Sequence, residues 1–167
     1  RALAVGLDAM GVGRGDKVAV VGANRPRLYW TIAALQSLRA IPVPVYADAV
    51  AEEMAYVLDH AGARLAIVQD QEQVDKIRSF ADRIPALKTL VYDEPRGLAD
   101  YDHADLKSFD DVQEQGRLIM QRDTSAAAKW EQDIRAASGD DVSIMLYTSG
   151  TTGRSKGVMI RSAAAVK

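Results

Sequence analysis

The stretch KVAVVGANRPRLYWTIAALQSLRAIPVPVY, residues 17–46, decides the fold class because a strand, a helix and a second strand follow one another in it. Lys17 to Val21 is a short β-branched run, which is typical of a strand. Asn24 is predicted to cap the helix, with Pro26 tolerated in its first turn and one apolar stripe facing a core. Ile41 to Tyr46 is predicted to be the second strand, and its prolines favour an edge position or a strand end.

The same alternation continues as far as residue 92. A helix follows with an acidic first turn, and Gly62 is expected to end it. Further strands are predicted at Leu65–Val68 and Thr89–Tyr92, with another helix between them. The apolar faces of these two helices are predicted at Met54, Val57, Leu58 and Ala61, and at Val74, Ile77 and Phe80. Four strands alternating with helices indicate an α/β fold, a three-layer, doubly wound, mostly parallel sheet with helices on both faces.

The second half of the chain departs from this pattern. Residues 93–107 are acidic and rich in turn residues, and we expect them to form a solvated excursion. Ser108 with Asp111 resembles a capping box, which predicts a helix through about Gln121. A second helix is expected over about residues 125–137.

The chain as a whole is expected to be one N-terminal subdomain, residues 1–167, of a longer protein. It starts at Arg1, and its last residues resemble the opening of a helix. The expected parts are alternating strands and helices (1–92), an acidic loop and helical spacer (93–139), and a strand, a polar loop and a strand (140–160).

Composition excludes several function classes. Apolar residues make up 48% and charged residues 26%, as in ordinary globular proteins, and the net charge of −2 gives no support to nucleic-acid binding. The chain has no cysteine and therefore no disulfide or thiolate metal site. Its longest apolar run has eight residues, whereas a membrane-spanning helix needs about 20. These features favour a cytoplasmic protein, with peripheral membrane contact left open.

Four conspicuous side chains are predicted to be structural. His60 lies at a helix end, where imidazole can bond free carbonyl groups, and His103 lies in the acidic segment. Neither has a second ligand at metal-binding spacing. Trp30 and Trp130 are expected to pack against the protein rather than stack on a substrate.

The segment from Val142 to Ile160 has the clearest chemistry. An apolar run leads into a loop of hydroxyls, glycines and a lysine, and a second apolar run follows. Glycines let the backbone approach a ligand, backbone N–H groups and hydroxyls donate to anionic oxygens, and a lysine suits a terminal phosphate. The candidate binding residues are Thr148, Ser149, Gly150, Thr151, Thr152, Gly153, Lys156 and Gly157. The loop is therefore predicted to hold a polyphosphate, although its composition also allows a solvated turn between two strands.

The order of residues in this loop distinguishes between the known families of phosphate-binding loops. It does not fit the P-loop pattern, because Lys156 follows Ser155 rather than a glycine, and no G-x-G-x-x-G opens a helix. From Tyr147 to Val158 it resembles the signature T-S-G-T-T-G-x-P-K-G of adenylate-forming enzymes, with Ser155 where proline is usual. The segments Gly13–Val20, Gly22–Pro26 and Ile41–Tyr46 are also similar to the N-terminal region of this superfamily.

The resemblance implies an ATP-dependent ligase. A carboxylate attacks the α-phosphate of ATP to form an acyl-adenylate and pyrophosphate, and the thiol of coenzyme A then displaces AMP. By position in the signature, Thr148 helps to hold Mg²⁺, whereas Ser149 to Thr152 and Lys156 contact phosphate oxygens. Lys156 is the candidate catalytic residue, and Gly150, Gly153 and Gly157 shape the loop.

The resemblance also bears on the substrate and on the rest of the protein. Tyr46 and the long helical spacer look more like long-chain fatty acyl-CoA synthetases than aryl-CoA ligases. An aryl-CoA ligase, an adenylation domain of a peptide synthetase and a non-catalytic nucleotide-binding or scaffolding module are the alternatives. The expected partners are the carboxylic acid, ATP, coenzyme A, the remaining N-terminal domain and a mobile C-terminal domain. The family's other motifs come later in the sequence, so we expect the isolated chain to be inactive.

Overall fold

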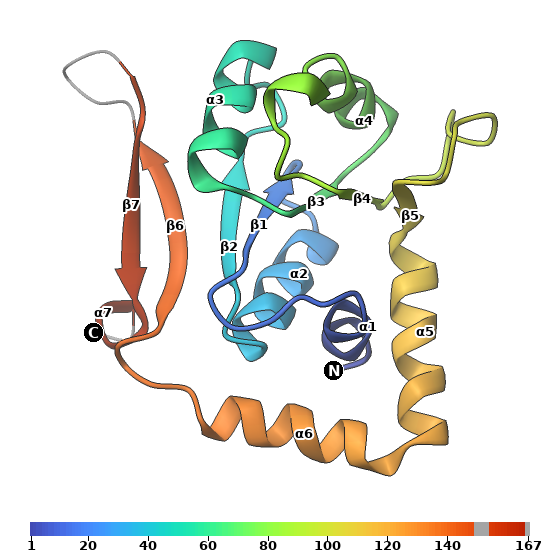
Figure 1. The fold of residues 1–167 in the computed structure, drawn as a ribbon, viewed down its shortest axis with the longest axis vertical. Coiled ribbons are helices and arrows are strands. Elements are labelled where there is room, and N and C mark those ends of the chain that lie inside the picture. The colour runs from blue at the N-terminus through green and yellow to red at the C-terminus, as the bar shows by residue number, and fades with distance from the viewer. Residues whose placement is uncertain (149–153, 166–167) are drawn as a thin grey trace.

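The computed structural model describes residues 1–148 and 154–165, and its centre is a five-stranded parallel sheet (Figure 1). The strand order is β2-β1-β3-β4-β5, and every neighbouring pair in this sheet is parallel. The strands are β1 (Lys17–Val21), β2 (Ile41–Val45), β3 (Leu65–Val68), β4 (Thr89–Tyr92) and β5 (Leu106–Ser108). The chain reverses its direction of travel across the sheet between β1 and β3, as in doubly wound folds.

Helices cover both faces of this sheet, which confirms the predicted three-layer α/β fold. The helices are α1 (Ala2–Ala9), α2 (Pro26–Ser37), α3 (Ala51–Ala61), α4 (Gln71–Arg78), the 3-10 turn η1 (Ala81–Arg83), α5 (Phe109–Arg122), α6 (Thr124–Arg135) and α7 (Ser162–Ala165). Val18 and Val20 of β1 join the core beneath α1, α2 and α5, whereas Ala19 and Val21 join the core beneath α3 and α4. Because successive side chains of a strand point to opposite faces, β1 must be apolar throughout.

Most of the predicted local signals are confirmed. The four residues predicted for the inner face of α3 are all buried, and Gly62 ends that helix in the left-handed region at φ 65°. The Ser108 hydroxyl accepts a hydrogen bond from the Asp111 amide at 3.3 Å, so Ser108 caps α5. The proline-containing strand β2 lies at the edge of the parallel sheet, where a missing N–H costs least.

Two predictions about local structure are wrong. Asn24 does not cap α2, because the extended residue before Pro26 is Arg25, which takes the N-cap position without a side-chain bond. The segment 93–107 is not wholly solvated, since Leu98 is buried and the fifth strand begins at Leu106. Trp30, which was predicted to pack against the protein, is 55% exposed.

Helices α1 and α5 cross at unusually close range, and two glycines permit it. A Cβ atom on Gly116 of α5 would overlap the carbonyl oxygen of Ala2, and one on Gly6 of α1 would overlap the carbonyl oxygen of Val112. The two helix backbones therefore touch each other directly at these positions, and a side chain of any size would separate them.

A separate antiparallel hairpin lies beside β2 (Figure 1). It consists of β6 (Val142–Thr148) and β7 (Lys156–Arg161), the two strands predicted around the polar loop. Met145 is buried in the core beneath α3, and Val142 and Tyr147 pack against that core. The side-chain amide of Gln36 on α2 also donates to the Ser143 carbonyl at 3.1 Å. The hairpin is thus attached to the parallel sheet by side chains rather than by a shared ladder.

Within residues 1–148 and 154–165, every helix is too short or too polar to cross a bilayer.

Candidate functional site

Two of the predicted site residues face each other across the hairpin. Thr148 of β6 is the cross-strand partner of Lys156 of β7, and both side chains are exposed. Directly opposed residues of an antiparallel pair have Cβ atoms about 5 Å apart and point to the same side. The Thr148 and Lys156 side chains therefore start from the same side of the hairpin, where the strands meet the predicted phosphate loop. The remaining predicted loop residues, Ser149, Gly150, Thr151, Thr152 and Gly153, lie outside the described residues.

Gly157 has a packing role that the sequence did not reveal. It lies in β7 opposite Tyr147, and its φ is not in the left-handed region. A Cβ atom there would overlap the Met145 methyl group and come within 3.1 Å of the Tyr147 ring. Gly157 is thus needed to make room for the two side chains that attach the hairpin to the core, and its predicted role in shaping the loop stays a prediction.

Tyr147 links the start of the loop to helix α3. Its hydroxyl shares a hydrogen bond of 2.7 Å with Nδ1 of His60, and the two rings meet edge to face at 5.7 Å. Burial raises the pKa of Tyr147 to about 12, so its hydroxyl stays protonated near neutral pH. The sequence suggested that His60 bonds the free carbonyl groups at the end of its own helix. In the structure it instead bonds Tyr147 of the hairpin.

The residues just after the loop also contact α3. The Tyr56 hydroxyl donates to the carbonyl oxygen of Ser155 at 3.1 Å, and the Ser155 hydroxyl donates to Glu53 over a longer 3.5 Å. The guanidinium of Arg154 lies over the Tyr56 ring, 5.5 Å from its centre. Sequence reasoning missed Tyr56 and Glu53, because neither stands near the loop in the chain.

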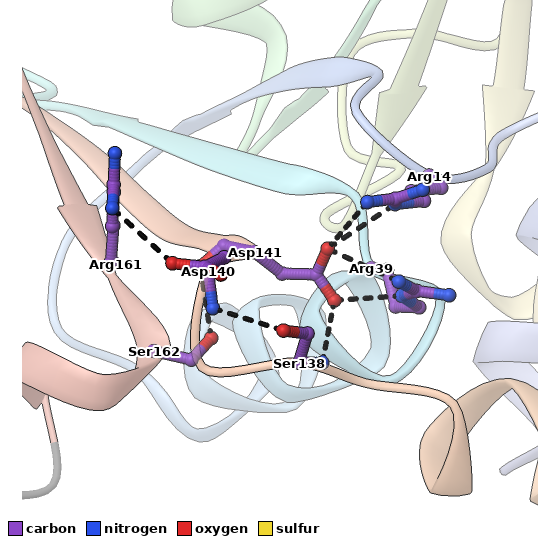
Figure 2. A network of polar contacts seen from close by, with 7 residues as sticks. All are labelled: Arg14, Arg39, Ser138, Asp140, Asp141, Arg161 and Ser162. Carbon is purple, nitrogen blue, oxygen red and sulfur yellow. Dashed lines mark hydrogen bonds and ion pairs between the residues drawn. The ribbon is translucent and has the colours of Figure 1, made fainter.

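An ionic network holds the base of the hairpin (Figure 2). Asp141 accepts bonds from Arg39 at 2.8 and 3.2 Å, from Arg14 at 3.2 Å and from the Ser138 amide at 2.9 Å, and its side chain is only 8% exposed. Arg39 has a φ of 58°, an unusual conformation for a residue with a side chain. The bonds from Arg39 and Ser138 hold the pKa of Asp141 well below its usual range.

We expect Asp141→Asn to lower the free energy of unfolding by about 2 kcal/mol at pH 7, because bonds to a charged acceptor are lost. The folded-state pKa of Asp141 is depressed, so its stabilisation is complete above the unfolded pKa near 3.9 and is lost as the pH falls below that value. The difference between wild type and variant should therefore shrink below about pH 4. Denaturant unfolding at several pH values measures it.

Asp140→Asn is the matched control for this prediction. Asp140 is 87% exposed and pairs only with Arg161 across 3.2 Å in the part of the chain that the structure describes. Exposed ion pairs contribute little, so this variant should stay within about 0.5 kcal/mol of wild type. Equal losses in both variants would contradict the anchoring role of Asp141.

The switch point of the parallel sheet, where doubly wound folds commonly bind ligands, offers little space here. The cavity between the ends of β1 and β3 has a volume of about 20 Å³, enough for one or two water molecules. Arg27 at its edge already pairs with Asp93 at 2.8 Å and lies over the Phe109 ring. The described residues also contain no cluster of three or more acidic or histidine side chains that could hold a metal ion. The hairpin therefore remains the candidate site.

Comparison with known proteins identifies the family of the chain. Residues 1–167 match the family described as AMP-binding enzyme. The chain is 33% identical to the long-chain-fatty-acid–CoA ligase ACSBG2 of Homo sapiens, over 96% of this chain and 23% of that protein. It is 31% identical to the 3-oxocholest-4-en-26-oate–CoA ligase of Rhodococcus rhodochrous, over 93% of this chain and 25% of that protein.

A solved structure has the same fold. The anthranilate CoA ligase AuaEII, in complex with anthranoyl-AMP, superposes with a TM-score of 0.77 at 22% identity, over 96% of this chain and 28% of that one. The chain thus spans about a quarter of the length of these relatives. Since the family matches every residue from 1 to 167, the chain belongs to the AMP-binding enzyme family, a family of adenylate-forming CoA ligases.

Proposed function

We propose that the protein containing this chain is an ATP-dependent acyl-CoA synthetase for a long-chain fatty acid. It joins the acid to AMP, releases pyrophosphate, and transfers the acyl group to the thiol of coenzyme A. The observation that supports this most directly is the pairing of Thr148 with Lys156 beside the predicted phosphate loop. The family membership and the names of two relatives, both carboxylate–CoA ligases, support the same reaction.

The part of this chain would be to bind the β- and γ-phosphates of ATP. Lys156 would place its ammonium group against phosphate oxygens and stabilise the charge that develops on the departing pyrophosphate. The backbone amides and hydroxyls of Ser149, Gly150, Thr151, Thr152 and Gly153 would donate to the same oxygens. The acid, the adenine and coenzyme A would bind mainly outside these residues.

One exposed hydroxyl supports the proposal that Mg²⁺ binds here together with ATP. The exposed hydroxyl of Thr148 is an uncharged oxygen donor, and Mg²⁺ in such sites takes most of its ligands from phosphates and water. When bound with ATP, Mg²⁺ would neutralise part of the negative charge on the phosphates. Thr148 would contribute one ligand, and Lys156 opposite it would add a second positive charge.

We also propose that residues 1–167 form one piece of a larger N-terminal domain. The hairpin presents Val158 and Met159 to solvent, 45% and 59% exposed, and a two-stranded sheet is marginally stable by itself. The chain covers about a quarter of its relatives, so the rest of the same protein is the expected cover for this surface. A separate mobile C-terminal domain would complete the site.

The test is ATP–pyrophosphate exchange by the full-length protein with different acids. Exchange that requires a long-chain fatty acid, followed by acyl-CoA formation, is the expected result, and the 167-residue chain alone should give none. Dependence on an aromatic acid would indicate an aryl-CoA ligase, and dependence on an amino acid would indicate a peptide-synthetase adenylation domain. No exchange with any acid, despite ATP binding, would favour a scaffolding module and refute the proposal.

A further inference from the structure

One side of helix α3 contacts the chain both before and after the predicted phosphate loop. Glu53, Tyr56 and His60 are spaced i, i+3 and i+7, so they form a single stripe along the helix. His60 bonds Tyr147 before the loop, and Tyr56 and Glu53 bond Ser155 after it. The Tyr56 and His60 rings are also in contact, with centres 5.4 Å apart.

This stripe has a rigid support behind it. The adjoining face of α3 is formed by Met54, Val57, Leu58 and Ala61, which are at most 3% exposed. A helix fixed in a close-packed core moves little, and side chains bonded to it inherit that rigidity. The chain segments on both sides of the loop are therefore held by the same rigid helix, α3.

The contact on the far side of the loop falls on the one position that departs from the signature. Proline is usual there, and its ring restricts the backbone without any partner. Ser155 lacks that restraint, but its carbonyl oxygen and its hydroxyl are both bonded to α3. Hydrogen bonds to α3 therefore restrain the position where a proline ring usually restrains the backbone.

We propose that Tyr56 is a positioning residue for ATP binding, which holds the backbone at Ser155 so that the neighbouring Lys156 faces the phosphates. This inference rests on the proposed function. Tyr56 touches Ser155 and Arg154, and it acts through them. Its hydroxyl compensates in this chain for the missing proline.

The test uses the full-length protein and follows the KM for ATP and kcat in the exchange assay. Tyr56→Phe removes only the hydroxyl, and loss of one hydrogen bond should raise the KM for ATP about threefold to tenfold. The KM for the acid and the thermal unfolding midpoint should change little. Tyr29→Phe, on an exposed helix tyrosine of α2, is the matched control and should leave all four quantities unchanged.

A double-variant cycle makes the test specific. Ser155→Pro restores the covalent restraint, so adding Tyr56→Phe to it should raise the KM for ATP less than twofold. An equal effect of Tyr56→Phe in both backgrounds would overturn the compensation, as would an equal rise in the KM for the acid.

Lys156→Ala separates this inference from the function on which it rests. If Lys156→Ala slows exchange while Tyr56→Phe behaves like Tyr29→Phe, the positioning role alone fails. If Lys156→Ala also leaves exchange unchanged, the proposed phosphate site fails with it.

Discussion

Lys156→Ala should slow ATP–pyrophosphate exchange by the full-length protein about 100-fold or more. Lys156 is exposed, lies opposite Thr148 and is placed at the end of the predicted phosphate loop. Removing one donor that stabilises developing charge commonly costs 10²–10³-fold in rate. Lys156→Arg keeps the charge but replaces a compact ammonium with a planar group, so we expect it to recover only part of the activity.

The control for this lysine is Lys107→Ala. Lys107 is also an exposed strand lysine, but it lies in β5, on the far side of the parallel sheet from the hairpin (Figure 1). The Lys107→Ala variant should catalyse ATP–pyrophosphate exchange at the wild-type rate. An unchanged rate in Lys156→Ala, or equal losses in the two variants, would show that Lys156 does not meet the transferring phosphates.

Gly116→Ala should lower the free energy of unfolding by about 2–3 kcal/mol, although alanine is the better helix former by about 1 kcal/mol. The added Cβ would overlap the carbonyl oxygen of Ala2 and come within 2.8 Å of the Gly6 amide nitrogen. Neither atom can yield, because both belong to the backbone of α1. The two helices must therefore move apart and lose part of the core around Phe109 and Val112. Denaturant unfolding measures the loss.

Gly13→Ala is the matched control for this effect. A Cβ atom on Gly13 would meet no atom within 4 Å, and the φ of Gly13 is not in the left-handed region. This variant should be neutral or slightly more stable than wild type. Gly6→Ala should resemble Gly116→Ala, and the double variant should lose less than the sum, because either methyl group opens the same contact. A stabilised Gly116→Ala protein would contradict the close crossing.

Most of the parallel sheet could be predicted because its signals are local. A buried strand such as Leu65–Val68 needs an unbroken apolar run, and a helix such as α3 needs apolar residues at a spacing of three and four. Strand β5 could not be predicted, since Lys107 and Ser108 are polar and Leu106 alone is buried. Its position depends on pairing with β4, which no neighbouring residue reveals.

Part of the candidate site could likewise be predicted from the sequence, and part of it could not. The order of hydroxyls, glycines and a lysine after Tyr147 predicts a phosphate loop, because that chemistry is contained in a dozen consecutive residues. The partners that hold its two ends, Tyr56 and His60, stand about 90 to 100 residues earlier. Their side chains show no pattern that distinguishes them from ordinary surface residues of a helix.

The sequence by itself determined the fold class, most of the strands and the type of ligand expected at the loop, since these follow from backbone preferences and side-chain periodicity over a few residues. Only the tertiary structure decided that α3 contacts both ends of that loop, that Asp141 meets Arg39 at the base of the hairpin, and that Gly116 must stay a glycine. Each of these depends on which distant surfaces the packed core brings together, and excluded volume and buried charge act on neighbours in space rather than in the chain.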